Sequence, residues 1–304
     1  MSGLEILTLD RVTKRYGNAT VLDGITFSVK KGSIVALVGQ NGAGKTTLMR
    51  VIASLTKPTG GKLTLFGESE AKKIKPLMKK LGCLIETPAL QLNMTGPDNL
   101  EFYRIRRGLS GSGLVNRVLE IVGLQHDRKK KVLNYSLGMK QRLGLAVCLL
   151  HGPEFLLLDE PANCLDPVGI VELRELIKDL NSKGITFIVS SHLISELTHI
   201  ASDYVIIHRG SVLDCLSPGE LANKCGKFTV FTVDSPEKAR ELLAQSFGFR
   251  NLEVASTNIV IRDEIDDVAE VNIRLTQAGF RVSSISHVSV SVEDYYVKLV
   301  KGAD

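Results

Sequence analysis

Residues 34–47 read Ile-Val-Ala-Leu-Val-Gly-Gln-Asn-Gly-Ala-Gly-Lys-Thr-Thr. The apolar residues 34–38 predict a buried strand, and the glycine-rich stretch after them predicts a phosphate-binding loop that leads into a helix. Glycines in the loop allow successive backbone N–H groups to turn inward around an anion, and the helix after Gly44 directs its positive dipole end at the same place. Lys45 would reach the β- and γ-phosphates of a nucleoside triphosphate, and the Thr46 hydroxyl lies where such loops hold Mg²⁺.

A glycine-rich β-turn without function is the alternative interpretation of this stretch. It is disfavoured because every fixed position of the loop motif is filled and a strand precedes the loop. The loop residues expected to contact the nucleotide are Gly39, Gln40, Asn41, Gly42, Ala43, Gly44, Lys45, Thr46 and Thr47.

Three further candidate site residues follow later apolar runs. Residues 155–160 read Phe-Leu-Leu-Leu-Asp-Glu, which places two carboxylates at the end of a buried strand, where an α/β sheet has its ligand crevice. Asp159 is suited to orient Mg²⁺ through its water shell, and Glu160 to accept a proton from the water that attacks the γ-phosphate. His192 follows the apolar run 186–190, from where its imidazole could donate to a γ-phosphate oxygen. The other histidines lack such a setting and are expected at the surface: His126, His151, His199, His208 and His287.

Composition narrows the class of protein. The chain has 304 residues, 44% hydrophobic and 23% charged, which suits one large globular domain and a small one. Its net charge of +5 is mildly basic, and its lysine-rich stretches are typical of solvated helix faces. Because the chain has no Trp and few other aromatic residues to stack on bases, we expect no nucleic-acid partner.

Cysteine usage and hydropathy predict the compartment. The five cysteines are widely spaced without a C-x-x-C pair, which indicates neither a disulfide framework nor a zinc site, and therefore a reducing environment. We find no signal peptide and no apolar stretch close to the roughly 18 residues that cross a bilayer. The polypeptide is therefore expected to be soluble by itself.

Short apolar strands alternate with longer amphipathic segments up to about residue 215, which predicts an α/β fold. The strand candidates are residues 4–9, 21–29, 34–38, 155–158, 186–190 and 204–208, of which the first two are expected to pair antiparallel. Between about residues 72 and 150 the pattern is mostly helical, which predicts a helical lobe inserted into the core. The helix candidates of this lobe are residues 98–107, 114–122 and 139–150.

A second domain is predicted after Ser217-Pro218. Its strand candidates are residues 227–233, 251–255, 258–263 and 281–288, and its helix candidates are 237–246, 268–278 and 291–300. The order β-α-β-β-α-β matches the split β-α-β arrangement of ferredoxin-like domains. We therefore predict a nucleotide-binding domain over residues 1–222 and a small α+β accessory domain over residues 227–304.

Residues 135–142 read Tyr-Ser-Leu-Gly-Met-Lys-Gln-Arg and lie shortly before the Asp159 strand. Here the chain resembles the ATP-binding subunit of ABC transporters, and the resemblance covers about residues 4–215. It implies a P-loop cassette, with a mixed sheet and a helical lobe, that binds ATP and Mg²⁺ and hydrolyses the ATP.

The resemblance also implies a homodimer. In the family, the Ser and Gly of the signature bind the γ-phosphate of ATP held by the opposite subunit, and Ser136 and Gly138 match these positions. Leu137 and Met139 depart from the usual Leu-Ser-Gly-Gly-Gln, but the hydroxyl, the second glycine and the helix dipole remain. Read alone, Ser136 is a helix N-cap.

Three more positions match family roles. Tyr16 aligns with the aromatic residue that stacks on adenine, the alternative being a loop tyrosine without such a contact. Asp166 aligns with the residue that contacts the other chain's phosphate loop. Glu86 aligns with a glutamine that meets Mg²⁺ and the attacking water, so that an anion replaces a neutral ligand; in an alternative register Gln91 occupies this position.

The Glu86 replacement and the signature look like the subgroup that serves bacitracin resistance and lantibiotic self-immunity by exporting antimicrobial peptides. The resemblance implies a separate membrane permease whose coupling helix docks near residues 86–105. The chain would then be cytoplasmic, peripheral on the inner face of the cell membrane, with the permease as its only membrane contact.

The sequence disfavours two other functions. A soluble ABC-type factor acting on ribosomes or DNA is disfavoured because the chain has a single phosphate loop and no heptad array. A nucleotide-dependent regulator without turnover is disfavoured because Glu160 and His192 are both present. The C-terminal domain shows no motif that carries chemistry.

Overall fold

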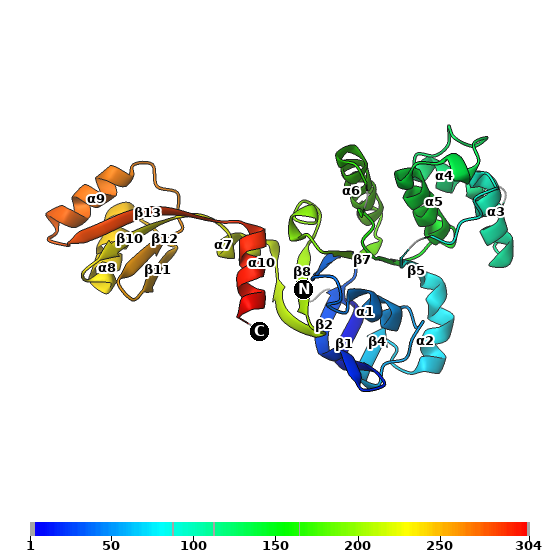
Figure 1. Cartoon of the computed structure of the whole chain (residues 1–304), viewed down its shortest axis with the longest axis horizontal. Coiled ribbons are helices and arrows are strands. Elements are labelled where there is room, and N and C mark those ends of the chain that lie inside the picture. The colour runs from blue at the N-terminus through cyan, green and yellow to red at the C-terminus, as the bar shows by residue number, and fades with distance from the viewer. Residues whose placement is uncertain (1–3, 87, 112, 164, 303–304) are drawn as a thin grey trace. The chain divides into compact units, whose positions relative to one another are not determined.

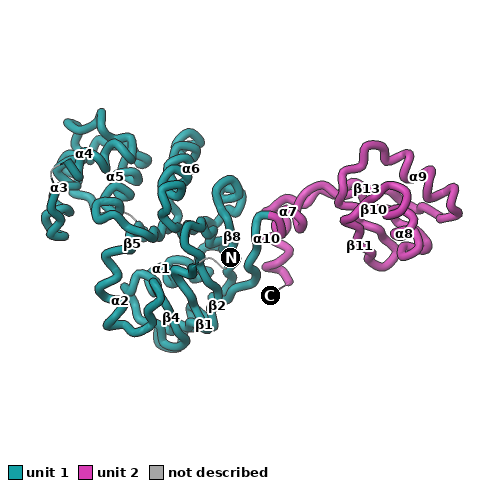
Figure 2. Tube along the Cα trace, turned by 180° about the vertical axis from the view of Figure 1, so that it is seen from behind, with its two compact units in different colours: residues 1–218, 303 teal, residues 219–302, 304 magenta. Residues whose placement is uncertain are grey.

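The computed structural model describes residues 4–86, 88–111, 113–163 and 165–302, and these form two compact units. The first contains the described residues up to Pro218, and the second runs from Gly219 to Gly302 (Figure 2). The sequence placed the boundary slightly later, between residues 222 and 227. Helix α7 (Pro218–Lys224) explains the difference, because the Nζ of Lys224 lies 3.1 Å from the hydroxyl of Tyr295 in α10 (Val292–Lys301) of the second unit.

The first unit is built on a six-stranded sheet in the order β5-β6-β7-β3-β8-β9. Its strands β5, β7 and β8 are labelled in Figure 1. All neighbouring strands are parallel except β8 and β9. The strands are β3 (Ile34–Val38), β5 (Leu81–Leu84), β6 (Phe155–Leu158), β7 (Thr186–Ser191), β8 (Asp203–His208) and β9 (Ser211–Leu216). β3 and β6 are buried throughout, which explains why their sequences are continuous apolar runs. Parallel pairing brings the carboxyl ends of β3, β6 and β7 to one edge of the sheet.

A second, antiparallel sheet has the order β2-β1-β4. It consists of β1 (Glu5–Tyr16), β2 (Ala19–Lys30) and β4 (Gly60–Leu65). The predicted antiparallel pairing of the first two strands is confirmed. One core joins the two sheets through the buried face of α1 (Lys45–Ile52), including Leu48 and Met49.

Three helices, α3 (Gly96–Arg106), α4 (Leu114–Ile121) and α5 (Leu137–Leu149), lie together near β5 (Figure 1). The remaining helical elements of this unit are α2 (Ala71–Leu77), α6 (Pro167–Ser182), η1 (Met78–Lys80), η2 (Val132–Asn134) and η3 (Ile194–Glu196). The predicted helical segment over residues 72–150 is too wide at its start, because β5 pairs with β6 and Ile74 of α2 joins the sheet core. A four-residue strand that contains a glycine is too short to show a period of two.

The second unit contains one four-stranded sheet in the order β11-β12-β10-β13, with every neighbouring pair antiparallel. Its elements are β10 (Gly226–Val233), α8 (Pro236–Phe247), β11 (Leu252–Ala255), β12 (Asn258–Ile261), α9 (Val268–Gln277) and β13 (Val282–Val290). β12 lies between β10 and β11, the two strands that α8 connects, which is a split β-α-β arrangement. Phe231 and Ile259 of the sheet pack with Leu243 and Leu275 of the helices in its core.

Candidate active site

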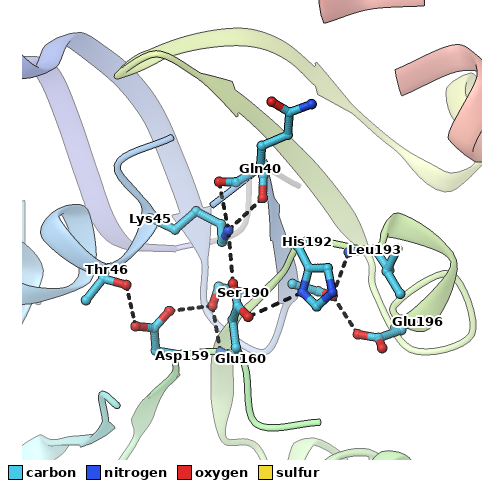
Figure 3. A network of polar contacts seen from close by, with 11 residues as sticks. Gln40, Lys45, Thr46, Asp159, Glu160, Ser190, His192, Leu193 and Glu196 are labelled. Atoms are coloured by element: carbon cyan, nitrogen blue, oxygen red, sulfur yellow. Dashed lines mark hydrogen bonds and ion pairs between the residues drawn. The ribbon is translucent and has the colours of Figure 1, made fainter. Parts of the chain in front are cut away.

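The loop between β3 and α1 surrounds the side chain of Lys45. This lysine is the first residue of α1 and only 4% exposed. Its Nζ donates to the carbonyl oxygens of Gly39 at 2.6 Å and Gln40 at 3.2 Å (Figure 3). The loop therefore holds a fixed cation at the N-terminus of a helix, where an anion is favoured.

The glycines of this loop are required by its geometry. Gly42 and Gly44 have φ angles of 83° and 106°, in the left-handed region that favours glycine. A Cβ atom at Gly44 would lie 2.9 Å from Cδ2 of Leu22, and one at Gly39 would lie 2.4 Å from the carbonyl oxygen of Ile207. A larger residue at Gly39 would require the backbone to move, and at Gly44 the φ angle strains any residue other than glycine.

Asp159 follows β6 directly and is 8% exposed. The hydroxyl of Thr46 donates to its Oδ2 at 2.7 Å, and the hydroxyl of Ser190 donates to its Oδ1 at 2.6 Å (Figure 3). The carboxylate and the Thr46 hydroxyl are hard oxygen donors, which suit Mg²⁺. Among the described residues, no group of three or more His, Cys, Asp or Glu side chains could hold a metal ion. The donor set thus fits Mg²⁺ bound together with substrate phosphates rather than in an all-protein cage.

Glu160 has a φ of 46°, which is uncommon for a residue other than glycine. Its backbone N–H donates to the Ser190 hydroxyl at 2.8 Å. Its Oε1 lies 3.1 Å from Nζ of Lys45, and its Oε2 lies 3.3 Å from Nδ1 of His192. The structure therefore brings together Lys45, Glu160 and His192, which the sequence predicted as catalytic residues from three separate motifs.

Ser190 is the member of this network that the sequence analysis missed. It lies in β7, is 1% exposed, and contacts both acidic residues through one hydroxyl. A polar residue at the end of an apolar strand, just before His192, was the available signal. The neighbouring hydroxyl of Ser191 instead donates to Oε2 of Glu196 at 2.6 Å and accepts from the N–H of Leu193 at 3.0 Å.

The predicted signature residues lie at the start of α5. Ser136 is its N-cap and accepts a hydrogen bond from the N–H of Met139 at 3.2 Å. Asp166 is the N-cap of α6 and accepts from the N–H of Gly169 at 3.0 Å. Ser136, Gly138 and Asp166 line one hollow of about 380 Å³. The residues predicted to contact an opposite subunit therefore share one surface.

Tyr16 ends β1 and is 48% exposed, with the Nζ of Lys14 at 4.7 Å from the centroid of its ring. Its contact with adenine stays a prediction. Because about half of the Tyr16 surface is exposed, the geometry permits stacking on an adenine ring.

The two candidates for the glutamine position differ in their contacts. Glu86 lies two residues after β5, and its Oε1 is 2.6 Å from Nη2 of Arg50 in α1. Gln91 is tied to α3, because its backbone N–H donates to Oδ1 of Asn99 at 2.7 Å and its carbonyl oxygen accepts from Nδ2 of Asn99 at 3.0 Å. Glu86 is thus the candidate connected to the helix of the phosphate loop.

The surface expectation is wrong for two histidines. His208 is only 8% exposed, because it ends the buried strand β8. His151 is half-buried; its Nε2 lies 3.1 Å from the carbonyl oxygen of Leu81 and its Nδ1 lies 2.9 Å from Arg107. Burial lowers the pKa of the His151 imidazole. Figure 3 labels neither of these histidines.

Comparison with known proteins gives the family. The sequence model of the ABC transporter family matches residues 22–163. The bacitracin transport ATP-binding protein BcrA of Enterococcus faecalis is 39% identical over 299 residues, which cover 98% of this chain and 97% of that protein. The chain belongs to the ABC transporter family. The lantibiotic transport ATP-binding protein SrtF of Streptococcus pyogenes is 38% identical over 208 residues, 68% of this chain and 89% of that protein.

Solved structures agree on the fold. An ATP-binding cassette of an ABC transporter in its ADP conformation matches with a TM-score of 0.66 and 23% identity, over 72% of this chain and 94% of that chain. The predicted α/β P-loop cassette is confirmed. As a member of this family the chain is an ATP-hydrolysing subunit, and such subunits bind ATP with Mg²⁺, dimerise and work with membrane permeases. No helix within the described ranges is long and apolar enough to cross a bilayer.

Proposed function

We propose that the chain is the ATPase subunit of an exporter that removes a peptide antibiotic of the bacitracin or lantibiotic type from the cell membrane. The observation that carries the proposal is the match to a bacitracin transport ATP-binding protein over 98% of this chain, because it runs through both units. The similarity to a lantibiotic transport protein over 68% of the chain supports the same class of cargo.

The phosphate loop binds the nucleotide. Backbone N–H groups of residues 39–47 surround the phosphates, and Lys45 exchanges its contacts with Gly39, Gln40 and Glu160 for β- and γ-phosphate oxygens. Thr46 and Asp159 would hold Mg²⁺, with Glu86 nearby, and the bound cation would neutralise charge on the phosphates. Tyr16 stacks on the adenine ring.

Glu160 acts as the general base. The nucleotide draws Lys45 toward the phosphates, so the Glu160 carboxylate becomes free to accept a proton from the attacking water. His192, held 3.3 Å from Glu160, donates to a γ-phosphate oxygen. Ser190 keeps the backbone of Glu160 and the side chain of Asp159 in place.

Two copies of the chain close over two nucleotides. The hollow lined by Ser136, Gly138 and Asp166 receives the γ-phosphate and the phosphate loop of the opposite copy. A Glu160→Gln variant binds ATP without hydrolysing it, so we expect it to form dimers in Mg²⁺ and ATP. Strictly monomeric behaviour of this variant at high protein concentration in light scattering would contradict the proposal.

The permease docks beside β5. A second hollow of about 220 Å³ lies at the carboxyl end of β5, next to α3 and α5. It is lined by Cys83, Leu84, Ile85, Pro88, Ala89, Leu90, Tyr103, Arg107, Gly144, Val147 and Cys148. This mixed apolar and basic lining suits a short amphipathic helix of a membrane protein. Through such docking the chain would lie on the cytoplasmic face of the membrane.

Antibiotic susceptibility tests the whole proposal. A strain without the gene should become more sensitive to bacitracin or to a lantibiotic, and the wild-type gene should restore growth, whereas a Glu160→Gln allele should not. A ribosome-targeting antibiotic serves as the control. Unchanged sensitivity to both peptide classes, or failure of the native chain to co-purify with a polytopic membrane protein, would exclude the proposed role.

A further inference from the structure

Arg50 lies in α1, the helix that also carries Thr46 of the predicted cation site. It follows Thr46 by four residues in α1, so the two side chains share a helix face one turn apart. Helical side chains lean toward the helix N-terminus, which directs Arg50 back toward Thr46. Its Nη2 lies 2.6 Å from Oε1 of Glu86. The ion pair therefore ties the Glu86 carboxylate to the helix that also carries Thr46.

The other side of the pair leads to the same place. Leu84, two residues before Glu86, pairs with Leu158 across β5 and β6, and its carbonyl oxygen accepts from the N–H of Asp159 at 2.8 Å. Glu86 has a φ of 63°, a left-handed conformation that departs from the extended strand. The chain thus leaves the strand at Glu86, two residues after a backbone contact with Asp159.

Both members of the ion pair are accessible. The side chain of Arg50 is 41% exposed and that of Glu86 is 60% exposed. Exposed pairs of this kind are weak, so either partner can exchange it for a stronger one. A divalent cation at Thr46 and Asp159 would be such a partner for a carboxylate.

We infer that Arg50 is a positioning residue that holds the Glu86 carboxylate in an ion pair, so that a cation at Thr46 and Asp159 has to compete with Arg50 for it. The inference rests on the proposed roles of Thr46 and Asp159. It assigns a reason for the anion at this position: Arg50 balances the charge of Glu86 until nucleotide and cation arrive together. Cation binding is then set by the Arg50–Glu86 contact and not by Glu86 alone.

Equilibrium binding tests this inference without turnover. Every variant is made in the full-length chain with Glu160→Gln. The dissociation constant of trinitrophenyl-ATP is measured by fluorescence, once in excess EDTA and once in excess Mg²⁺. Mg²⁺ binds the free nucleotide equally in all samples. The dissociation constant in EDTA divided by the dissociation constant in Mg²⁺ therefore compares how strongly each variant couples the cation to the nucleotide, and a higher ratio means stronger coupling.

Arg50→Gln should raise this ratio about two- to fivefold, because Glu86 no longer has a competing partner. Glu86→Gln should lower it, and Arg50→Gln combined with Glu86→Gln should match Glu86→Gln alone. Arg50→Lys keeps a cation near Glu86 and should stay close to the parent. Lys73→Gln is the matched control, because it removes one charge from an exposed pair whose atoms are 2.9 Å apart, Lys73 of α2 with the N-cap residue Glu70.

An unchanged or lower ratio for Arg50→Gln would overturn the inference. An equal change in the Glu86→Gln background, or in Lys73→Gln, would also overturn it, because the effect would then reflect net charge rather than this contact. The ATPase rate of the wild-type chain tests the proposed function separately, so the two conclusions can fail independently.

Discussion

Replacing Ser190 by alanine would remove the hydroxyl that joins the two acidic residues of the site. The hydroxyl donates to Oδ1 of Asp159 at 2.6 Å and accepts from the N–H of Glu160 at 2.8 Å, and the residue is 1% exposed. The change leaves one carboxylate oxygen and one backbone N–H without this partner in the interior. Asp159 keeps its hydrogen bond from Thr46, so we expect its carboxylate to become less well ordered without leaving the site.

The two lost hydrogen bonds set the expected loss in the free energy of unfolding. A hydrogen bond to a charged group contributes about 1.5–3 kcal/mol and a neutral one about 1 kcal/mol, so we expect a loss of about 2–3 kcal/mol after partial relaxation. For a unit of this size that loss lowers the melting temperature by about 4–12 °C. Mutation of a polar residue that orients the ligands of a cation typically lowers activity about 10- to 100-fold, and we expect a fall in kcat of this size.

Ser191→Ala is the matched control. The Ser191 hydroxyl also makes two hydrogen bonds, to Glu196 and to the N–H of Leu193, and neither of these bonds involves Asp159 or Glu160. Melting curves of the nucleotide-free chain and a phosphate-release assay at saturating Mg²⁺ and ATP separate stability from catalysis. We expect the two variants to have similar melting temperatures, both below that of the wild type. Only Ser190→Ala should also lower kcat. Equal kcat values for the two variants would refute the reasoning.

Three further predictions concern the loop, the base and the thiols. Glu160→Gln should reduce the ATPase rate about 100-fold or more while ATP binding persists, and a rate near that of the wild type would remove Glu160 from the role of base. Gly39→Ala places a Cβ 2.4 Å from a backbone carbonyl oxygen, so we expect it to weaken fluorescent ATP binding more than tenfold, whereas Gly219→Ala, which meets no atom within 4 Å, should not. Cys148 is buried, and burial raises the pKa of its thiol to about 12, so at pH 8 iodoacetamide should spare Cys148 in the native chain. Burial also raises the pKa of the Cys215 thiol, but this residue is exposed and should therefore be labelled faster than Cys148, as mass spectrometry can show. Rapid native labelling of Cys148 would contradict the packing of that thiol.

Local patterns made much of the site predictable. The phosphate loop is a continuous stretch whose glycines are required by backbone geometry, so its position is visible in the sequence. Asp159 and Glu160 are visible because they directly follow a fully buried apolar strand. The two helices of the second-unit sheet layer were readable because each buries residues four apart, Ala239 and Leu243 in α8 and Val271 and Leu275 in α9.

Short or irregular elements were not predictable in this way. β5 has four residues and β4 begins with two glycines, so neither shows enough alternation to mark a strand. These segments become strands because neighbouring strands offer them backbone hydrogen bonds, as β6 does for β5 and β1 for β4. Such partners are properties of the assembled sheet.

The sequence alone determined the family, the phosphate loop and the acidic strand end, because each depends on residues close together in the chain. The tertiary structure alone decided which hydroxyl joins Asp159 to Glu160 and which cation faces Glu86. Ser190 reaches Asp159 across 31 residues, and Arg50 reaches Glu86 across 36. Contacts of that range depend on strand order and loop direction, and no local period encodes them.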